Sequence, residues 1–132
     1  QQPSKRKSVA NTGPVAASGM KPRREVICDD ALLWLERPGS LPESCIVVTS
    51  LPDSTEVKEI APTIEEWKAW FLRAMRCVFK ALPARGVAVF YQTDIRIMNE
   101  EQVSKSFLVL KAADEFQDIV LRWHKVVHVG SI

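Results

Sequence analysis

The sequence contains little glycine, and its glycines form no phosphate-binding loop. Five glycines occur in 132 residues, with no G-x-G-x-x-G pattern and no G-x-x-x-x-G-K-S/T pattern. Such loops cradle nucleotide phosphates with backbone N–H groups. The G-x-S-x-G turn that exposes a nucleophilic serine is also missing. The sequence therefore excludes the common glycine-loop cofactor sites and the nucleophile elbow.

Cysteine and histidine are scarce, which argues against a metal site. Cys28, Cys45 and Cys77 lie far apart and form no C-x-x-C pair. His124 and His128 are four residues apart in a predicted strand, which separates them by about 13 Å and prevents them from sharing an ion. We predict no metal site and three buried free thiols, as is typical of a reducing compartment.

Long apolar runs are absent as well. No run approaches the roughly 18 residues that a transmembrane helix needs, and the polar, basic start has no apolar core of a secretory signal. We therefore expect neither a membrane span nor a secretory leader. The acid-free start is compatible with the region behind a cleaved mitochondrial presequence.

Positive charge is concentrated at the start of the chain. Residues 1–24 carry a net charge of +6 without any acidic side chain, whereas residues 25–132 hold 12 basic and 16 acidic side chains. The segment is rich in Ser, Ala, Pro and Gly and cannot bury a core of its own. Two interpretations remain open, an arm that binds RNA phosphates and a solvated tail. The basic residues of the arm are Lys5, Arg6, Lys7, Lys21, Arg23 and Arg24.

From residue 25 onward, predicted strands and helices alternate. Asp29 or Asp30 can cap the first helix, and Thr63 with Glu66 forms a capping box for a longer one. This alternation is typical of parallel βαβ units. The predicted elements are strands at 25–28, 45–51, 86–95 and 119–129 and helices at 31–36, 63–82 and 102–116.

The helix predicted at 63–82 has a wide apolar stripe with helical spacing. The stripe consists of Ile64, Trp67, Trp70, Phe71, Ala74, Met75, Val78, Phe79 and Leu82, and Lys68, Arg73, Arg76 and Lys80 lie off it. We expect Phe107, Leu108 and Ala112 to face inward from the helix at 102–116. All four tryptophans, Trp34, Trp67, Trp70 and Trp123, are expected in the core or an interface.

Two predicted loops are candidates for a ligand site. Because parallel strands end at one edge of a sheet, ligands bind in the crevice beyond those ends. Residues 49–54 follow the strand at 45–51, which we expect to be buried on both faces. Gln92, Thr93 and Asp94 end the strand at 86–95. Ordinary turn chemistry also explains these residue types.

These segments resemble a family. DDALLWL, VVTSLPD, EEWKAWF, GVAVFYQTDI, VSKSFLVLKAADE and LRWHKVV look like parts of methyltransferase-like proteins. The chain is more distantly similar to amino-group methyltransferases that use S-adenosylmethionine. The resemblance covers about residues 26–128. It implies a Rossmann-like, mostly parallel sheet with flanking helices, as a partial methyltransferase fold over residues 26–132, and an extended basic tail over residues 1–25.

The resemblance also implies roles at the loop after the strand at 45–51. Ser50 stands where the family accepts a hydrogen bond from the target amino group, and Pro52 matches its second proline. Leu51 replaces the first proline, and Asp53 replaces the aromatic residue that stacks on a target base. Gln92 and Asp94 are the candidates for contact with S-adenosylmethionine, although the glycine-bearing strand of the family is not visible.

Two functions follow from these observations. The altered loop, the missing glycine motif and the basic tail favour a non-catalytic, methyltransferase-like subunit of a large ribonucleoprotein, such as a mitochondrial ribosome or its assembly intermediate. Its partners would be rRNA and neighbouring proteins in the mitochondrial matrix, or alternatively in the cytoplasm. The other function is an active methyltransferase acting on RNA or protein. A methyltransferase fold can persist without catalysis, because fold does not fix function.

Overall fold

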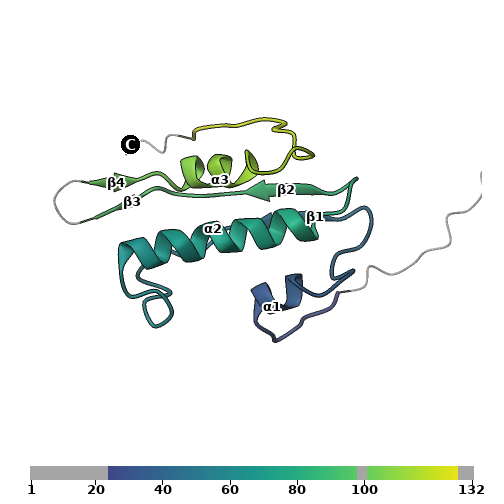
Figure 1. Ribbon diagram of the computed structural model, residues 1–132, viewed down its shortest axis with the longest axis horizontal. Coiled ribbons are helices and arrows are strands. Elements are labelled where there is room, and N and C mark those ends of the chain that lie inside the picture. The colour runs from purple at the N-terminus through teal and green to yellow at the C-terminus, as the bar shows by residue number, and fades with distance from the viewer. Residues whose placement is uncertain (1–23, 98–100, 128–132) are drawn as a thin grey trace, which may run out of the picture.

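Three helices and two short pairs of strands make up residues 24–97 and 101–127, the part of the chain that the computed structural model describes (Figure 1). In chain order they are α1 (Ala31–Leu35), β1 (Ile46–Thr49), α2 (Ile64–Ala81), β2 (Val87–Phe90), β3 (Ile95–Arg96), β4 (Gln102–Val103) and α3 (Lys105–Ala113). β1 pairs with β2 in parallel, and β3 pairs with β4 antiparallel. The protein is therefore a mixed α/β structure with one short parallel sheet. The predicted order of four strands alternating with three helices is wrong.

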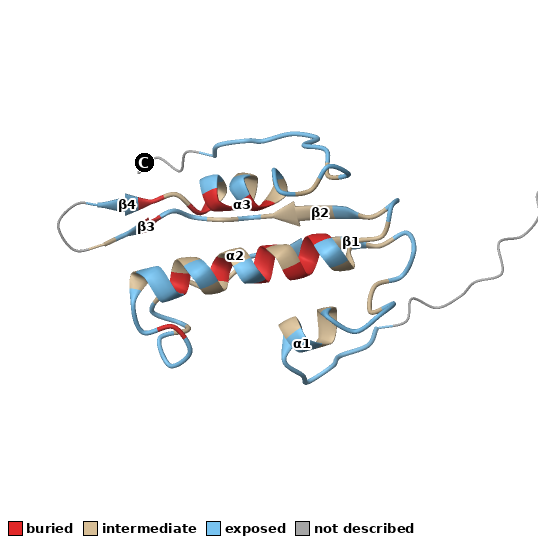
Figure 2. Ribbon diagram, viewed as in Figure 1, coloured by how far each residue is buried: buried red, intermediate tan, exposed pale blue. Residues whose placement is uncertain are grey.

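The prediction for α2 is confirmed, with its bounds shifted by one residue at each end. Thr63 accepts a hydrogen bond from the Glu66 N–H at 3.2 Å, and the Glu66 carboxylate accepts one from the Thr63 N–H at 3.0 Å. These bonds satisfy two amide groups that a helix start leaves free. The apolar stripe turns inward, and Figure 2 shows buried residues along one side of α2.

The core lies between α2, the β3–β4 hairpin and α3. Trp67, Phe71 and Met75 from α2 are fully buried against Ile95 and Leu108. The prediction that Leu108 faces inward is confirmed, as it is for Ala112. No helix among the described residues combines the length and apolar character needed to cross a bilayer.

Helix α1 begins as predicted at an aspartate. The Asp30 carboxylate accepts hydrogen bonds from the N–H groups of Leu32 and Leu33 at 2.9 and 3.0 Å. Gly39 then turns the chain with a φ of +70°, a left-handed conformation that glycine adopts without strain. Helix α1 packs beside α2.

The β1–β2 sheet is covered on one face only. Phe90 contacts Phe79 of α2, with the ring centroids 5.7 Å apart. On the opposite face, Ile46 and Val48 are 67% and 71% exposed. The expectation that this strand is buried on both faces is therefore wrong, because no described element packs on the second face.

Two predicted strands are not formed. Residues 25–28 have no regular structure, and Val26 and Ile27 are exposed because no strand among the described residues pairs with them. Residues 119–127 are likewise irregular and mostly exposed; the remainder of the predicted strand at 119–129, including His128, lies outside the described residues. Trp123 in this segment is 63% exposed, which corrects its predicted burial.

The elements predicted at 86–95 and 102–116 have different bounds. β2 ends at Phe90, and the chain resumes as β3 only at Ile95. Residues 102–103 pair as β4 rather than opening the helix, so α3 begins at Lys105 after its cap Ser104. The prediction that Phe107 faces inward is wrong: Phe107 is exposed, because the next residue, Leu108, occupies the buried face of α3 and successive residues of a helix point in different directions.

The three thiols differ in burial. Cys77 is buried as predicted, Cys45 is partly buried and Cys28 is exposed; all three are free. The prediction is wrong for Cys28 because the strand expected to bury it does not form. Among the other tryptophans, Trp34 and Trp70 are half-buried, and Trp67 belongs to the core.

Candidate functional site

The two predicted loops meet at the carboxyl edge of the β1–β2 sheet. Thr49 lies opposite Phe90 in the parallel register, and the Tyr91 N–H donates a hydrogen bond to the Thr49 carbonyl at 3.0 Å. Residues 50–54 and 91–94 therefore leave the sheet at the same edge. The sequence prediction that these loops share one edge is confirmed.

A lysine that the sequence analysis did not single out joins the two loops. The Lys105 Nζ donates hydrogen bonds to the Asp53 carboxylate and, at 3.4 Å, to the Leu51 carbonyl. The Lys105 backbone N–H donates to Asp94 Oδ1 at 3.1 Å. We call Asp53, Asp94 and Lys105 the lysine–carboxylate cluster. Its lysine side chain is only 2% exposed, whereas that of Asp53 is 39% exposed.

Burial makes the pairing of Lys105 necessary. An ammonium group without a partner in the interior is costly, so Asp53 and the Leu51 carbonyl compensate the lost hydration. A signal of this residue was present in the sequence, because Lys105, Leu108 and Ala112 share one face of α3. A lysine on an otherwise apolar face is expected to have a buried partner.

Asp94 fixes the start of α3. Its second carboxylate oxygen accepts a hydrogen bond from Gln102 Nε2 at 3.2 Å. Together with the bond from the Lys105 N–H, this places a negative charge at the helix N-terminus, where the helix dipole favours it. Asp94 therefore has a structural role in joining the second loop to α3.

The first loop is fastened at several points. Trp67 Nε1 of α2 donates a hydrogen bond to the Pro52 carbonyl at 3.2 Å, and the Asp53 N–H donates to Glu56 Oε2 at 2.7 Å. Ser50 is exposed at the start of the loop. Of the three predicted loop residues, Pro52 and Asp53 are thus held against α2 and α3, and Ser50 faces solvent.

Gln92 is the remaining predicted residue at this edge. Both polar atoms of its side chain are buried, and neither has a hydrogen-bond partner among the described residues. An amide can donate two hydrogen bonds and accept two, so this group has unmet capacity. Since Asp53 and Asp94 are already engaged, one free amide does not make a site for S-adenosylmethionine, and the described residues do not fit that cofactor.

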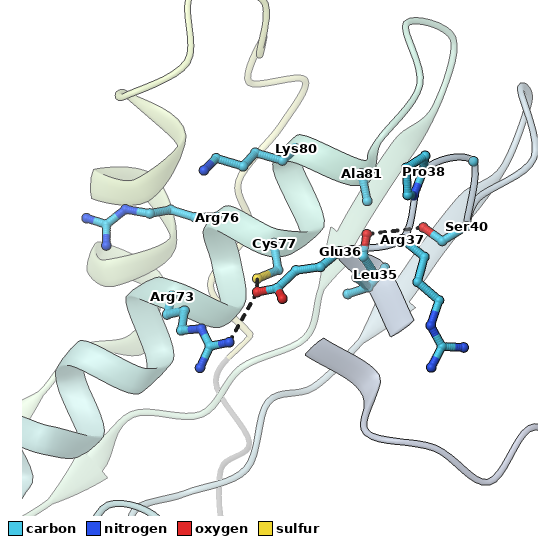
Figure 3. Close-up of a pocket in the computed structure, with 11 residues that line it drawn as sticks. Leu35, Glu36, Arg37, Pro38, Ser40, Arg73, Arg76, Cys77, Lys80 and Ala81 are labelled. Atoms are coloured by element: carbon cyan, nitrogen blue, oxygen red, sulfur yellow. Dashed lines mark hydrogen bonds and ion pairs between the residues drawn. The ribbon is translucent and has the colours of Figure 1, made fainter. Parts of the chain in front are cut away.

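A cleft of about 530 Å³ lies elsewhere, between the turn after α1 and the last turns of α2 (Figure 3). Glu36 reaches across it, accepting a hydrogen bond from Arg73 at 3.1 Å and contacting the Cys77 thiol at 3.6 Å. Burial, followed by this contact, raises the pKa of Cys77. Arg76 bonds Glu115 through two nitrogens, at 2.6 and 2.7 Å. The cleft is lined by basic side chains and is separate from the lysine–carboxylate cluster.

The predicted basic arm is represented here by Arg24, which is exposed. The other five residues of the arm, Lys5, Arg6, Lys7, Lys21 and Arg23, lie outside the described residues. Within the described ranges, no three His, Cys, Asp or Glu side chains are placed to hold a metal ion. No protein-family model, curated protein or solved structure that was compared with this chain matches it.

Proposed function

We propose that this chain is a methyltransferase-like, non-catalytic subunit of a large ribonucleoprotein, and that its basic arm contacts RNA. The assembly that fits best is a mitochondrial ribosome or its assembly intermediate, in the mitochondrial matrix. The observation that carries the proposal is the pairing of Asp53 with the buried Lys105. In the family that the chain resembles, the position of Asp53 holds an aromatic residue that stacks on a target base.

The pairing argues against catalysis by this loop. A base-stacking position has to be open and apolar, whereas Asp53 is charged and joined to α3. The loop carbonyls of Leu51 and Pro52 are also bonded, to Lys105 and Trp67. Because these hydrogen bonds hold the loop against α2 and α3, they support a structural role for this Rossmann-like domain rather than a catalytic one.

Exposed apolar side chains support a role as a subunit. Ile46 and Val48 are exposed on the open face of the sheet, and Val26, Leu121 and Val126, in other segments of the chain, are also more than half exposed. Large apolar surfaces on a folded domain mark contacts with other macromolecules. Neighbouring proteins of a large assembly would cover them.

The arm supplies the contact with RNA. Its six basic residues can each neutralise a phosphate group, so binding should weaken steeply with salt. For single-stranded RNA each contact contributes about 0.7 to the slope of log K against log salt, hence about 4 for the whole arm. Replacing the six residues with glutamine should remove that part of the slope; an unchanged slope would reject the arm as an RNA contact.

A second candidate function is an active methyltransferase acting on RNA or protein. The observation that favours it is the buried amide of Gln92, whose oxygen and nitrogen have no hydrogen-bond partner among the described residues. Isothermal titration of the full chain with S-adenosylmethionine separates the two functions. The absence of binding heat up to millimolar ligand is expected of the structural subunit, whereas one-to-one binding would contradict it.

Localisation and assembly give an independent test. The proposal predicts that the tagged full chain co-sediments with ribosomal particles from mitochondria and that ribonuclease treatment shifts it to the top of the gradient. If the chain sediments as a free protein with and without ribonuclease, in mitochondrial and in cytoplasmic fractions, it is not a subunit of a ribonucleoprotein and the proposal is rejected.

A further inference from the structure

The C-terminal half of α2 carries a row of basic side chains that take no part in the proposed contact between the basic arm and RNA. Arg73, Arg76 and Lys80 are spaced i, i+3 and i+7, which places them on one face of the helix. We call these three residues the basic stripe. All three line the cleft beside α1, and Figure 3 shows Arg76 and Lys80 extending from α2 on the side away from α1.

The stripe concentrates positive charge on a body that is otherwise acidic. Residues 25–132 hold 12 basic and 16 acidic side chains, yet three bases follow one another along the cleft. Arg37 is a fourth base, on the opposite wall, where it forms an ion pair with Asp29 at 2.6 Å, and Glu36 is the acidic side chain of the lining. At 1.5 Å per residue the stripe extends about 10 Å along α2, enough for more than one anionic group.

The basic side chains keep donors free. Arg73 uses one nitrogen on Glu36, and Arg76 uses two on Glu115. A guanidinium has five N–H donors, so each arginine retains several for another anion. Lys80 forms no ion pair with the described residues. Exposed ion pairs stabilise a fold by only about 0–1 kcal/mol, so they orient the guanidinium groups without closing the site.

We propose that the basic stripe is a second RNA contact, which binds phosphate groups of the RNA backbone beside the cleft. The proposal rests on the proposed function and locates a contact on the folded domain in addition to the arm. RNA phosphates suit the arginine forks, which bond phosphate oxygens in pairs, while Lys80 adds a compact point charge.

The test measures binding of a fluorescent single-stranded RNA by anisotropy, with the full chain, between about 50 and 200 mM salt. The stripe variant is Arg73→Gln/Arg76→Gln/Lys80→Gln. Its charge-matched control, Lys58→Gln/Arg85→Gln/Arg96→Gln, changes three exposed bases outside this cleft. The stripe variant should bind about tenfold more weakly at low salt and lose about 2 from the salt slope, while the control stays within about threefold of the wild type.

Each other outcome overturns the stripe contact. Equal losses in the stripe variant and the control would show that only net charge matters. If the variant whose six arm residues are replaced loses RNA binding and the stripe variant binds like the wild type, the stripe is not an RNA contact. The proposed function would then still stand. A wild-type chain that does not bind RNA would reject both. The same measurement with fluorescent polyglutamate is the control for an acidic protein partner: if the stripe variant loses binding to polyglutamate and keeps binding to RNA, the stripe contacts an acidic protein and the RNA contact is rejected.

A single substitution keeps the test valid if the triple variant unfolds. Lys80→Glu breaks no ion pair of the described residues, and it should lower the melting temperature only slightly, because it places a negative charge in the last turn of α2 and near Glu115. It should weaken RNA binding at least about threefold, because it replaces one phosphate contact with a repulsive charge. Wild-type affinity in this folded variant would overturn the proposal.

Discussion

The ammonium group of Lys105 donates a hydrogen bond to the Asp53 carboxylate, joining the first residue of α3 to a loop 52 positions earlier in the chain. The lysine is almost fully buried and the aspartate is partly exposed. The same lysine also bonds the Leu51 carbonyl and, through its backbone, Asp94. The two loops at the carboxyl edge of the β1–β2 sheet are therefore held by one residue.

Removing the carboxylate should destabilise the fold. Breaking a buried ion pair costs about 3–5 kcal/mol, and the partial exposure of Asp53 reduces the expected loss for Asp53→Asn to about 1–3 kcal/mol. Urea unfolding measures this free energy. Adding Lys105→Met should recover much of the loss, because no unpaired ammonium then remains.

Asp118→Asn is the matched control, since Asp118 is exposed and distant in sequence from the cluster. It should change the free energy of unfolding by less than about 0.5 kcal/mol. If Asp53→Asn behaves like this control, or if the double variant loses the sum of both single losses, the pairing does not stabilise the fold.

The buried amide of Gln92 should be replaceable with a gain in stability. Neither of its polar atoms has a partner among the described residues, and an unsatisfied buried group costs about 1–3 kcal/mol. Methionine has a similar shape without the amide, so Gln92→Met should raise the free energy of unfolding by about 1 kcal/mol. A loss of stability would instead mean that the amide is bonded in the folded protein.

The three cysteines should react at different rates. Burial raises the pKa of Cys77, and the contact with Glu36 adds to it, so little reactive thiolate forms near neutral pH. Mass spectrometry after brief alkylation should find Cys28 modified first and Cys77 at least about tenfold more slowly. In urea the two rates should converge; equal rates in the native protein would contradict the burial of Cys77.

Stability should depend on Glu115 in a particular pH range. Its hydrogen bond with Arg76 lowers the pKa of Glu115 below the ordinary value of 4.5. A lowered pKa means that the folded state holds the proton less strongly, so the stabilisation is present above the ordinary value and is lost as the pH falls through the lowered one. The melting temperature of the wild type should therefore exceed that of Glu115→Gln at neutral pH and converge with it as the pH falls below the lowered pKa of Glu115. Glu59→Gln, at another exposed acid, should not show this convergence.

Local signals in the sequence were sufficient for α1 and α2. The capping box at Thr63 and the continuous apolar stripe fixed α2, because both depend on residues within a few turns. The edge at which the loops meet was also predictable, since it follows from the parallel pairing of two β-branched segments. The residue that joins them was not singled out, because the partner of Lys105 lies 52 positions away.

Burial of strands could not be predicted from local pattern. Ile46 and Val48 have the composition of a fully buried strand, yet whether a face is covered depends on elements far away in the chain. The segment at 119–127 is also rich in apolar and β-branched residues, but no strand among the described residues pairs with it and it is irregular. The strand predicted at 86–95 is interrupted between Phe90 and Ile95 by polar residues. One of them, Asp94, accepts a hydrogen bond from the backbone of Lys105 in α3, and the chain therefore forms two strands, β2 and β3.

The parallel register of β1 and β2 has a consequence for the order of folding. Ile46 pairs with Val87, 41 positions later, so the sheet forms only when the intervening chain, including α2, has become compact. We expect α2, with its complete capping box, to form early and so to shorten this loop. Thr63→Ala, which weakens the cap, should therefore slow refolding, whereas Val89→Ala in the sheet should chiefly accelerate unfolding. Stopped-flow kinetics distinguish these effects. If α2 forms first, it is the surface on which β1 and β2 pair.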